Sequence, residues 1–236
     1  RFAGFAGRAA RGRIRRAFAA RARDYVVHVA IHVTGNNIGD VALTHAVRSA
    51  FDCVLGPQQW YCYPLWRRMQ PVDVARFNQR SRGLIVGGHG LLTPDTMAHI
   101  SSGWQWNIDV STMQGLRVPL IVFAVGYNRF RDQADFPERF VRHINETVRQ
   151  SVFFGLRNTG SVERVREYLE PFLRQRVTFQ PCPTTVLARH YPGYKAHLRQ
   201  EGVKRIAVNV AFDRMHLRIG ADGPNGWMSS STVSLP

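Results

Sequence analysis

The 236-residue sequence predicts an α/β fold, in which a mainly parallel, Rossmann-like sheet carries helices on both faces. Short apolar runs alternate along the chain with segments whose apolar residues recur at helical spacing, and this alternation is typical of parallel sheets. Glycine, asparagine, aspartate and arginine gather directly after the predicted strands. Because ligands of such sheets bind in the loops at the carboxyl ends of the strands, we expect a site there.

The strand predictions rest on short runs of β-branched and aliphatic residues bounded by glycine-rich or polar loops. The first run, YVVHVAIHV, is broken only by His28 and His32. These histidines alternate on one strand face, and we expect them to pack there rather than to bind a metal. Strands are predicted at 25–33, 83–88, 118–126, 151–157 and 205–214.

The segments between the strands have the apolar spacing of helices. Helices are predicted at 41–51, 72–80, 109–116, 136–150 and 159–173. Because 44% of the residues are hydrophobic, the chain has enough apolar surface for a core, which excludes general disorder. No apolar run approaches the roughly 18 residues that a membrane-spanning helix needs.

The order of the elements predicts three regions. Residues 1–23 form a basic Arg/Ala-rich lead-in, and residues 24–204 form the Rossmann-like domain. Residues 205–236 supply the first strand of a truncated second domain and a Gly/Ser/Pro-rich tail. Since the chain begins at Arg1 rather than Met, we expect it to be a fragment.

Half of the net charge of +16 lies in the lead-in, where residues 1–23 contain eight arginines and no acid. The arginines scatter around the helical wheel, and Phe2, Phe5, Ile14 and Phe18 form no continuous stripe. We therefore favour a solvated helix or disordered lead-in outside the catalytic fold. The alternatives are nucleic-acid binding and weak contact with anionic lipid at the inner membrane surface.

Cysteine usage favours a reducing compartment. The three cysteines, Cys53, Cys62 and Cys182, are odd in number and lack CxxC spacing. A disulfide framework or a structural zinc site is therefore not expected, and we predict a cytoplasmic protein.

Two glycine-rich loops after the first two strands carry candidate functional residues. In TGNNIGD (34–40), Asn36 and Asn37 offer donors and acceptors, and Asp40 can bind a sugar hydroxyl or simply cap the helix. In GGHG (87–90), the amide of Gly88 can hold an anion and His89 can transfer a proton. The alternative for GGHG is a tight turn with an incidental histidine.

Two later loops add an amide and a cation. Asn128 follows the third strand in GYNRFR and is a plausible ligand contact. In GLRNTGSVERV (155–165), Arg157 ends a strand, Asn158 or Thr159 caps the next helix, and Ser161 lies in its first turn. A guanidinium beside a helix N-terminus suits an anion. The alternative is that Arg157 belongs to a structural ion pair.

Together these stretches resemble the polysaccharide pyruvyl transferase family. The matching pieces occur in the family's order over residues 25–189, and they are NNIGD followed by a helix, GLIVGGHGLL, SGWQWNI, VPLIVFAVGYNRF, FGLRNTGSVERVREYL and FQPCPTTVL. The resemblance implies half of a GT-B-type architecture. It also implies an enzyme that transfers a pyruvyl group from phosphoenolpyruvate to two hydroxyls of a sugar. The product is a cyclic ketal on a surface polysaccharide, and phosphate is released.

The resemblance also implies roles for the candidate residues. Arg157 matches the family's donor-binding arginine, and a general acid and a base are needed for the transfer. The catalytic candidates are Asp40 and His89. The donor-binding candidates are Arg157, Asn158, Ser161 and Gly88. The acceptor-binding candidates are Asn36, Asn37 and Asn128. Neither a metal nor a cofactor is expected, and the partners are phosphoenolpyruvate and a glycan or lipid-linked sugar, not nucleic acid.

Two departures from the family pattern bear on activity. Asn158 stands where the family usually has Asp, and most of the second domain, with a histidine expected to help bind the donor, is missing; His216 follows the last predicted strand too closely for that role. We therefore expect that these residues alone do not turn over. The rival assignments are a nucleotide-sugar glycosyltransferase on the same scaffold and a non-catalytic basic protein that binds nucleic acid or an anionic surface.

Overall fold

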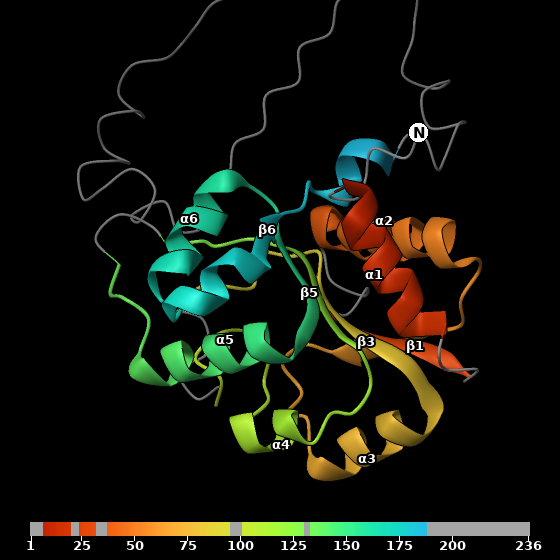
Figure 1. The fold of residues 1–236 in the computed structure, drawn as a ribbon, viewed down its shortest axis with the longest axis horizontal. Helices are drawn as coiled ribbons and strands as arrows, with labels where there is room; N and C mark the ends of the chain where they lie inside the picture. The colour runs from red at the N-terminus through yellow and green to blue at the C-terminus, as the bar shows by residue number, and fades with distance from the viewer. Residues whose placement is uncertain (1–6, 20–23, 32–36, 95–100, 130–132, 188–236) are drawn as a thin grey trace, which may run out of the picture.

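The fold is described from a computed structural model (Figure 1). It covers residues 7–19, 24–31, 37–94, 101–129 and 133–187. The predicted strand at 205–214, the tail and His32 lie outside these residues. The predicted domain limits at 204 and 205 lie outside them as well.

A single sheet of six parallel strands forms the centre of the molecule. The strands are β1 (Tyr25–Ala30), β2 (Trp60–Pro64), β3 (Ser81–Gly87), β4 (Leu120–Val125), β5 (Ser151–Leu156) and β6 (Val177–Phe179). Their order in the sheet is β2-β1-β3-β4-β5-β6. The predicted α/β class with a Rossmann-like parallel sheet is therefore confirmed. The strand order reverses between β1 and β3, which is where such sheets bind ligands.

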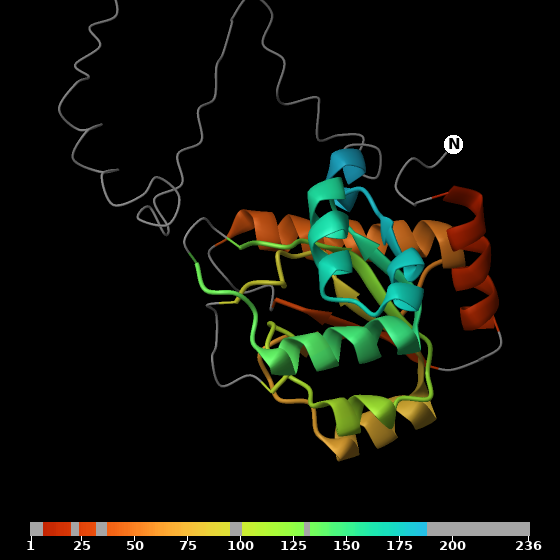
Figure 2. The same cartoon turned by 60° about the vertical axis from the view of Figure 1, so that its left-hand side comes forward.

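Helices flank the sheet on both faces. They are α1 (Gly7–Ala19), α2 (Ile38–Leu55), α3 (Pro71–Arg80), α4 (Val110–Gln114), α5 (Glu138–Gln150) and α6 (Thr159–Glu167), with two short 3₁₀ helices, η1 (Pro171–Arg176) and η2 (Pro183–Val186). In Figure 2, α2 lies on one side of the sheet, and α3, α4 and α5 lie on the other. The chain thus buries two separate apolar layers, one on each face.

The central strands are buried on both faces, which explains why the sequence predicts them well. β4, with the sequence LIVFAV, is buried at every position. On β1, Val27 and Val29 join the larger core beneath α3 to α6, while Val26 joins the smaller core beneath α1 and α2. A parallel strand buried in this way is a nearly continuous apolar run.

Side chains at the helix starts fix where four of the helices begin, among them α4, which Asp109 caps by accepting a hydrogen bond from the amide of Thr112. Asn37 caps α2 by accepting a hydrogen bond from the amide of Gly39. Asn158 caps α6 by accepting one from the amide of Ser161. A capping box between Gln70 and Asp73 opens α3. These caps satisfy amides that have no partner within the helix.

The basic lead-in contains a helix with exposed arginines, one of the two expected forms, but the expectation that it lies outside the fold is wrong where the structure describes it. α1 packs against the sheet, with Ile14 and Phe18 fully buried in the smaller core and Ala10 and Ala17 packed beside them. These four residues form a stripe along one side of the helix. Two alanines in this stripe carry little hydrophobic signal, which is why the helical wheel did not reveal it.

The two edge strands were not predicted. β2 reads WYCYP, and most of its residues are only half buried. β6 has three residues, of which Phe179 is exposed. Neither has the apolar run of a central strand, and each pairs with one neighbour only. The predicted helix at 159–173 is also shorter than expected, because α6 ends at Glu167 and η1 begins at Pro171.

Candidate functional site

The loops after β3, β4 and β5 lie side by side at the carboxyl edge of the sheet. The amide of Gly126 donates to the carbonyl of His89 at 2.9 Å, and the amide of Arg157 donates to the carbonyl of Val125 at 3.0 Å. A further bond of 2.8 Å joins the amide of Asn128 to the carbonyl of Leu92. Backbone contacts therefore bring three of the four predicted loops together.

The guanidinium of Arg157 rests on a floor of two glycines, Gly90 and Gly126. A Cβ atom at Gly126 would lie 2.2 Å from Nε and 2.4 Å from Cζ of Arg157. A Cβ atom at Gly90 would lie 3.3 Å from Nη2 of the same side chain. Since non-bonded carbon atoms do not approach to 2.4 Å, only glycine at 126 allows the guanidinium to take this place. We call this pair of residues the glycine floor.

Asn128 holds Arg157 in position. Its Oδ1 accepts a hydrogen bond of 3.0 Å from Nη2 of Arg157, and its Nδ2 donates to the carbonyl of Gly90 at 3.4 Å. Both ends of the amide are thus engaged inside the protein, so Asn128 is better suited to orienting Arg157 than to binding a sugar.

Arg157 has no carboxylate partner among the residues that the structure describes. The structural ion pair considered as its alternative role is therefore not seen there. The guanidinium is half buried, and its Nε and Nη1 make no hydrogen bond within the same residues. Two donors on one planar cation remain for a ligand, which is the geometry that carboxylate and phosphate oxygens match.

The N-terminus of α6 lies directly after Arg157. Asn158 caps the helix with a hydrogen bond of 2.7 Å from the amide of Ser161, so its Oδ1 faces the backbone rather than a ligand. The hydroxyl of Ser161 is buried and accepts from the amide of Tyr127 at 3.0 Å, which ties α6 to the loop after β4. The amides of Thr159 and Gly160, at the exposed first turn, have no carbonyl partner within the helix. They are the donors that remain here for an anion.

Asp40 and His89 lie together, although 49 positions separate them in the chain. Nδ1 of His89 lies 3.1 Å from Oδ1 of Asp40, and Nε2 lies 3.4 Å from Oγ1 of Thr44. An ionised carboxylate can only accept, so Nδ1 donates to Asp40 and Nε2 accepts from the threonine hydroxyl. One neutral tautomer of the imidazole therefore satisfies both contacts.

Of this pair, only Asp40 reaches solvent. The side chain of His89 is fully buried and both of its nitrogens are engaged, whereas the side chain of Asp40 is 27% exposed. A proton can therefore pass between a bound molecule and Asp40, while His89 acts behind it. The carboxylate is the group that can touch a substrate, and the imidazole orients it.

Gly88 plays a different part from the one expected. Its amide donates to the carbonyl of Phe123 at 2.9 Å, so it has no free N–H for an anion. Its φ of +92° and a Cβ position only 2.8 Å from Val47 Cγ2 require glycine where the loop passes beneath α2.

Asn37 is exposed and caps α2 through its Oδ1, which accepts a hydrogen bond from the amide of Gly39. Its Nδ2 takes no part in this capping bond. Asn36 lies outside the described residues.

Three residues of this site were missed at the sequence level. Gly90 and Gly126 form the glycine floor, and Thr44 fixes His89. A signal existed for each: Gly126 is the last residue of the predicted strand 118–126, Gly90 ends the GGHG loop after the predicted strand 83–88, and Thr44 lies four positions after Asp40, on the same helix face. The patterns do not show that a side chain from a third strand lies over the glycines.

The backbone kinks just before the glycine floor. Ala124 has a φ of 54°, which residues other than glycine seldom adopt, and the register of β4 against β5 shifts between Val122 and Val125. Because Ala124 precedes Gly126 by two residues, this kink sets the path of the chain beneath Arg157.

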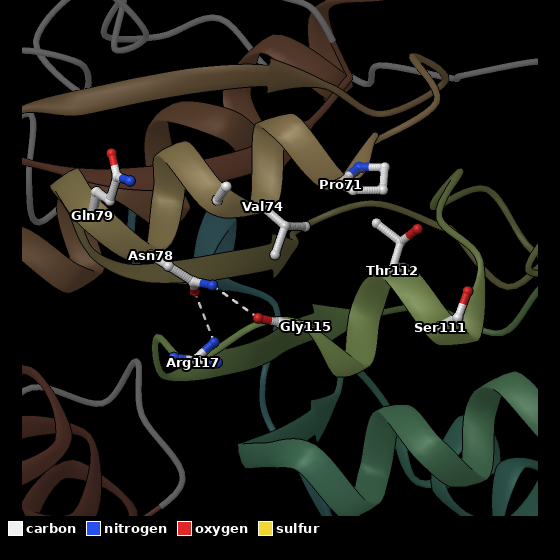
Figure 3. Close-up of a pocket in the computed structure, with 9 residues that line it drawn as sticks. Pro71, Val74, Asn78, Gln79, Ser111, Thr112, Gly115 and Arg117 are labelled. Atoms are coloured by element: carbon white, nitrogen blue, oxygen red, sulfur yellow. Dashed lines mark hydrogen bonds between the residues drawn. The ribbon is translucent and has the colours of Figure 1, made fainter.

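A groove of about 680 Å³ lies elsewhere, between α3 and α4 (Figure 3). Asn78 bridges its base, donating to the carbonyl of Gly115 at 2.8 Å and accepting from the amide of Arg117 at 2.7 Å. No predicted site residue lines it. The groove therefore does not contribute to the candidate site.

Three further observations on the described part of the chain concern metal ligands, cysteines and membrane spans. No three His, Cys, Asp or Glu side chains gather there so as to hold a metal ion. Cys53, Cys62 and Cys182 form no disulfide among the described residues. None of the described helices combines the length and the apolar character needed to cross a membrane.

Comparison with known proteins does not assign the chain to a family. No protein-family model matches it, and searches of the curated proteins and of the solved structures find no match either.

Proposed function

We propose that this chain forms part of an enzyme that transfers a pyruvyl group from phosphoenolpyruvate to two hydroxyls of a sugar. The product is a cyclic ketal on a surface glycan. The supporting observation is that Arg157, oriented by Asn128 on the glycine floor and free of any carboxylate in the described residues, lies beside the N-terminus of α6. The sequence resemblance points to the same reaction.

The donor site suits a small dianion. Phosphoenolpyruvate carries a carboxylate and a phosphate, which need a bidentate cation and backbone amides. Arg157 offers Nε and Nη1, and Thr159 and Gly160 offer amides at the positive end of α6. One anionic group would lie on the guanidinium and the other on the helix start.

Asp40 is proposed as the base for the acceptor. A sugar hydroxyl adds to the carbon that bears the phosphate and gives its proton to the Asp40 carboxylate, while a proton from solvent is added to the methylene carbon, which becomes a methyl group. The second hydroxyl then displaces phosphate at the same carbon and closes the ketal. Its proton leaves with the phosphate, and the Asp40 proton returns to solvent. His89 is a positioning residue, because it orients Asp40 and is itself buried.

Phosphoenolpyruvate binding to the 236-residue chain, followed by isothermal titration calorimetry, tests this proposal. Binding is the readout because we propose that part of the active site belongs to a second domain. Arg157→Ala is expected to weaken binding by more than about 1.5 kcal/mol, or more than roughly tenfold, since a charge-assisted contact is lost. The matched control is Arg164→Ala, because Arg164 is exposed on the same helix and pairs with Glu167.

Each outcome of the titration discriminates between assignments. Unchanged affinity in Arg157→Ala removes this arginine from the donor site. Binding of a nucleotide sugar but not of phosphoenolpyruvate favours the rival glycosyltransferase. Ketal formation by the isolated chain would contradict the expectation that these residues alone do not turn over.

A further inference from the structure

Helix α1 is a fixed part of the fold and presents its outer side chains from a rigid base. Ile14 and Phe18 are fully buried, and the Phe18 ring lies directly over Gly83, where a Cβ atom would be 2.4 Å from Cζ. Nη2 of Arg82 lies 3.5 Å from the carbonyl of Phe18. The Cα positions of the arginines on this helix are therefore set before any ligand arrives.

A groove of about 400 Å³ lies between α1 and the last turn of α2. It is lined by Arg8, Arg11, Gly12, Arg15, Cys53 and Val54. The three arginines are spaced three and four residues apart, so they share one side of α1. In Figures 1 and 2, α1 lies against the same side of the sheet as α2. Three arginine side chains thus line one concave surface.

The charge of these arginines is not balanced within the described residues. α1 contains no acid, and no described carboxylate lies within ion-pair distance of Arg8, Arg11 or Arg15. Like charges three and four residues apart destabilise a helix. Arg8 also lies in the first turn, where the helix dipole is already positive. The arrangement therefore works against the helix and concentrates positive potential in the groove.

A structural role offers the main alternative. The last turn of α2 has no basic residue of its own, so cations from α1 can offset the negative end of its dipole. The described residues include no hydrogen bond from Arg8, Arg11 or Arg15 to a carbonyl of α2. Direct contacts that would fix the arginines in this role are therefore not seen.

We propose that the groove between α1 and α2 binds a compact anion with two adjacent phosphoryl groups, held by Arg8, Arg11 and Arg15. Guanidinium groups form paired hydrogen bonds with phosphate oxygens, and several arginines around one anion share its charge. A concave site encloses a small group. A diffuse basic surface that bound a membrane or a long duplex would also draw on exposed arginines of α1 outside the groove, such as Arg13.

Titration with inorganic diphosphate at constant ionic strength tests the site. The Arg157→Ala chain is used throughout, so that the proposed donor site does not contribute. Arg11→Gln is expected to weaken binding at least tenfold, because Arg11 is half buried in the groove between the other two arginines. Arg13→Gln removes the same charge from the same helix outside the groove and is expected to change the affinity less than twofold.

Gly12 provides a second test that changes no charge. A Cβ atom there would meet only Nη1 of Arg16, at 3.6 Å, so larger side chains fit at this position. Gly12→Leu is expected to fill the groove and abolish diphosphate binding, while Gly12→Ala leaves most of it open and retains binding. Both variants favour the helix over glycine, so loss of α1 would not explain the difference.

The proposal fails if diphosphate does not bind, or if Arg13→Gln weakens binding as much as Arg11→Gln does. It also fails if phosphatidylglycerol vesicles or a DNA duplex bind while diphosphate does not, since that would show a diffuse basic surface. A lower melting temperature in Arg11→Gln with unchanged diphosphate affinity would establish the structural role instead.

Discussion

At the scale of single residues, the close approach of Arg157 to Gly126 makes position 126 a sensitive test of the site. Gly126→Ala would place a methyl group only 2.2 Å from Nε and 2.4 Å from Cζ of Arg157. We expect the guanidinium to be displaced and phosphoenolpyruvate binding to weaken at least tenfold. Titration calorimetry of the variant measures this loss, and its thermal midpoint reports on the fold.

Gly12→Ala is the matched control for this prediction. A Cβ atom at Gly12 meets only Nη1 of Arg16, at 3.6 Å, alanine suits a helix, and Gly12 lies on α1 outside the proposed donor site. Equal loss of binding in the two variants would mean that the glycine floor does not position Arg157.

Residue types and spacing predicted part of this site, but not how its members divide the work. Asp40 and His89 were both expected to be catalytic, and they are in contact. Only the fold shows that the imidazole is enclosed between Asp40 and Thr44. Likewise, Asn128 was expected to face a sugar, whereas its side-chain oxygen accepts a hydrogen bond from Arg157. Partners contributed by distant strands decide these roles, and a local pattern does not contain them.

At the scale of secondary-structure elements, α1 shows that a charged helix can be a structural one. Phe18→Ala is expected to destabilise the fold by about 3 kcal/mol, because it leaves a cavity over Gly83 in a buried layer. Urea unfolding followed by circular dichroism measures the change. The control is Phe172→Ala, since Phe172 is 59% exposed and its loss creates no comparable cavity.

The change in the free energy of unfolding of Phe18→Ala shows whether α1 belongs to the cooperatively folding unit or lies outside it. If Phe18→Ala unfolds at the same urea concentration as the unchanged chain, α1 is not part of the cooperative unit. The sequence-level expectation of a lead-in outside the fold would then be correct after all. A loss of several kcal/mol means that removal of the segment would also weaken the scaffold of the site.

The sequence predicted the buried central strands and missed the less buried edge strands. The four central strands have apolar runs that identify them, and β4 is buried throughout. The edge strands β2 and β6 owe their conformation to one neighbour each, and their own residues are mixed. Tertiary pairing, rather than local propensity, decides such segments.

At the scale of the whole molecule, two buried histidines make stability depend on pH. Burial lowers the pKa of His28 to about 3 and that of His143 to about 4. Both are neutral in the fold: His28 lies 3.2 Å from the carbonyl of Gly87, and His143 accepts a hydrogen bond from Trp104. In the unfolded chain both titrate near pH 6.5.

The unfolded state therefore binds more protons below pH 6.5, and the free energy of unfolding decreases as the pH falls towards about 4. Each histidine contributes a slope of up to about 1.4 kcal/mol per pH unit. Urea midpoints between pH 7 and pH 5 measure this effect above the range in which carboxylates titrate. His143→Gln is expected to reduce the slope by about half, and equal midpoints at pH 7 and pH 5 would contradict the assignment.

The position of α1 also governs when the chain can complete its fold. α1 is the first described helix, yet it packs against β5, whose residues come more than a hundred positions later. Closing so long a segment is entropically unfavourable and slow, so the helix docks after the strands beneath it have assembled. During synthesis, we therefore expect Ile14 and Phe18 to lack part of their packing surface until β5 has left the ribosome. The helix that precedes the rest of the fold in sequence is among the last parts to join it in time.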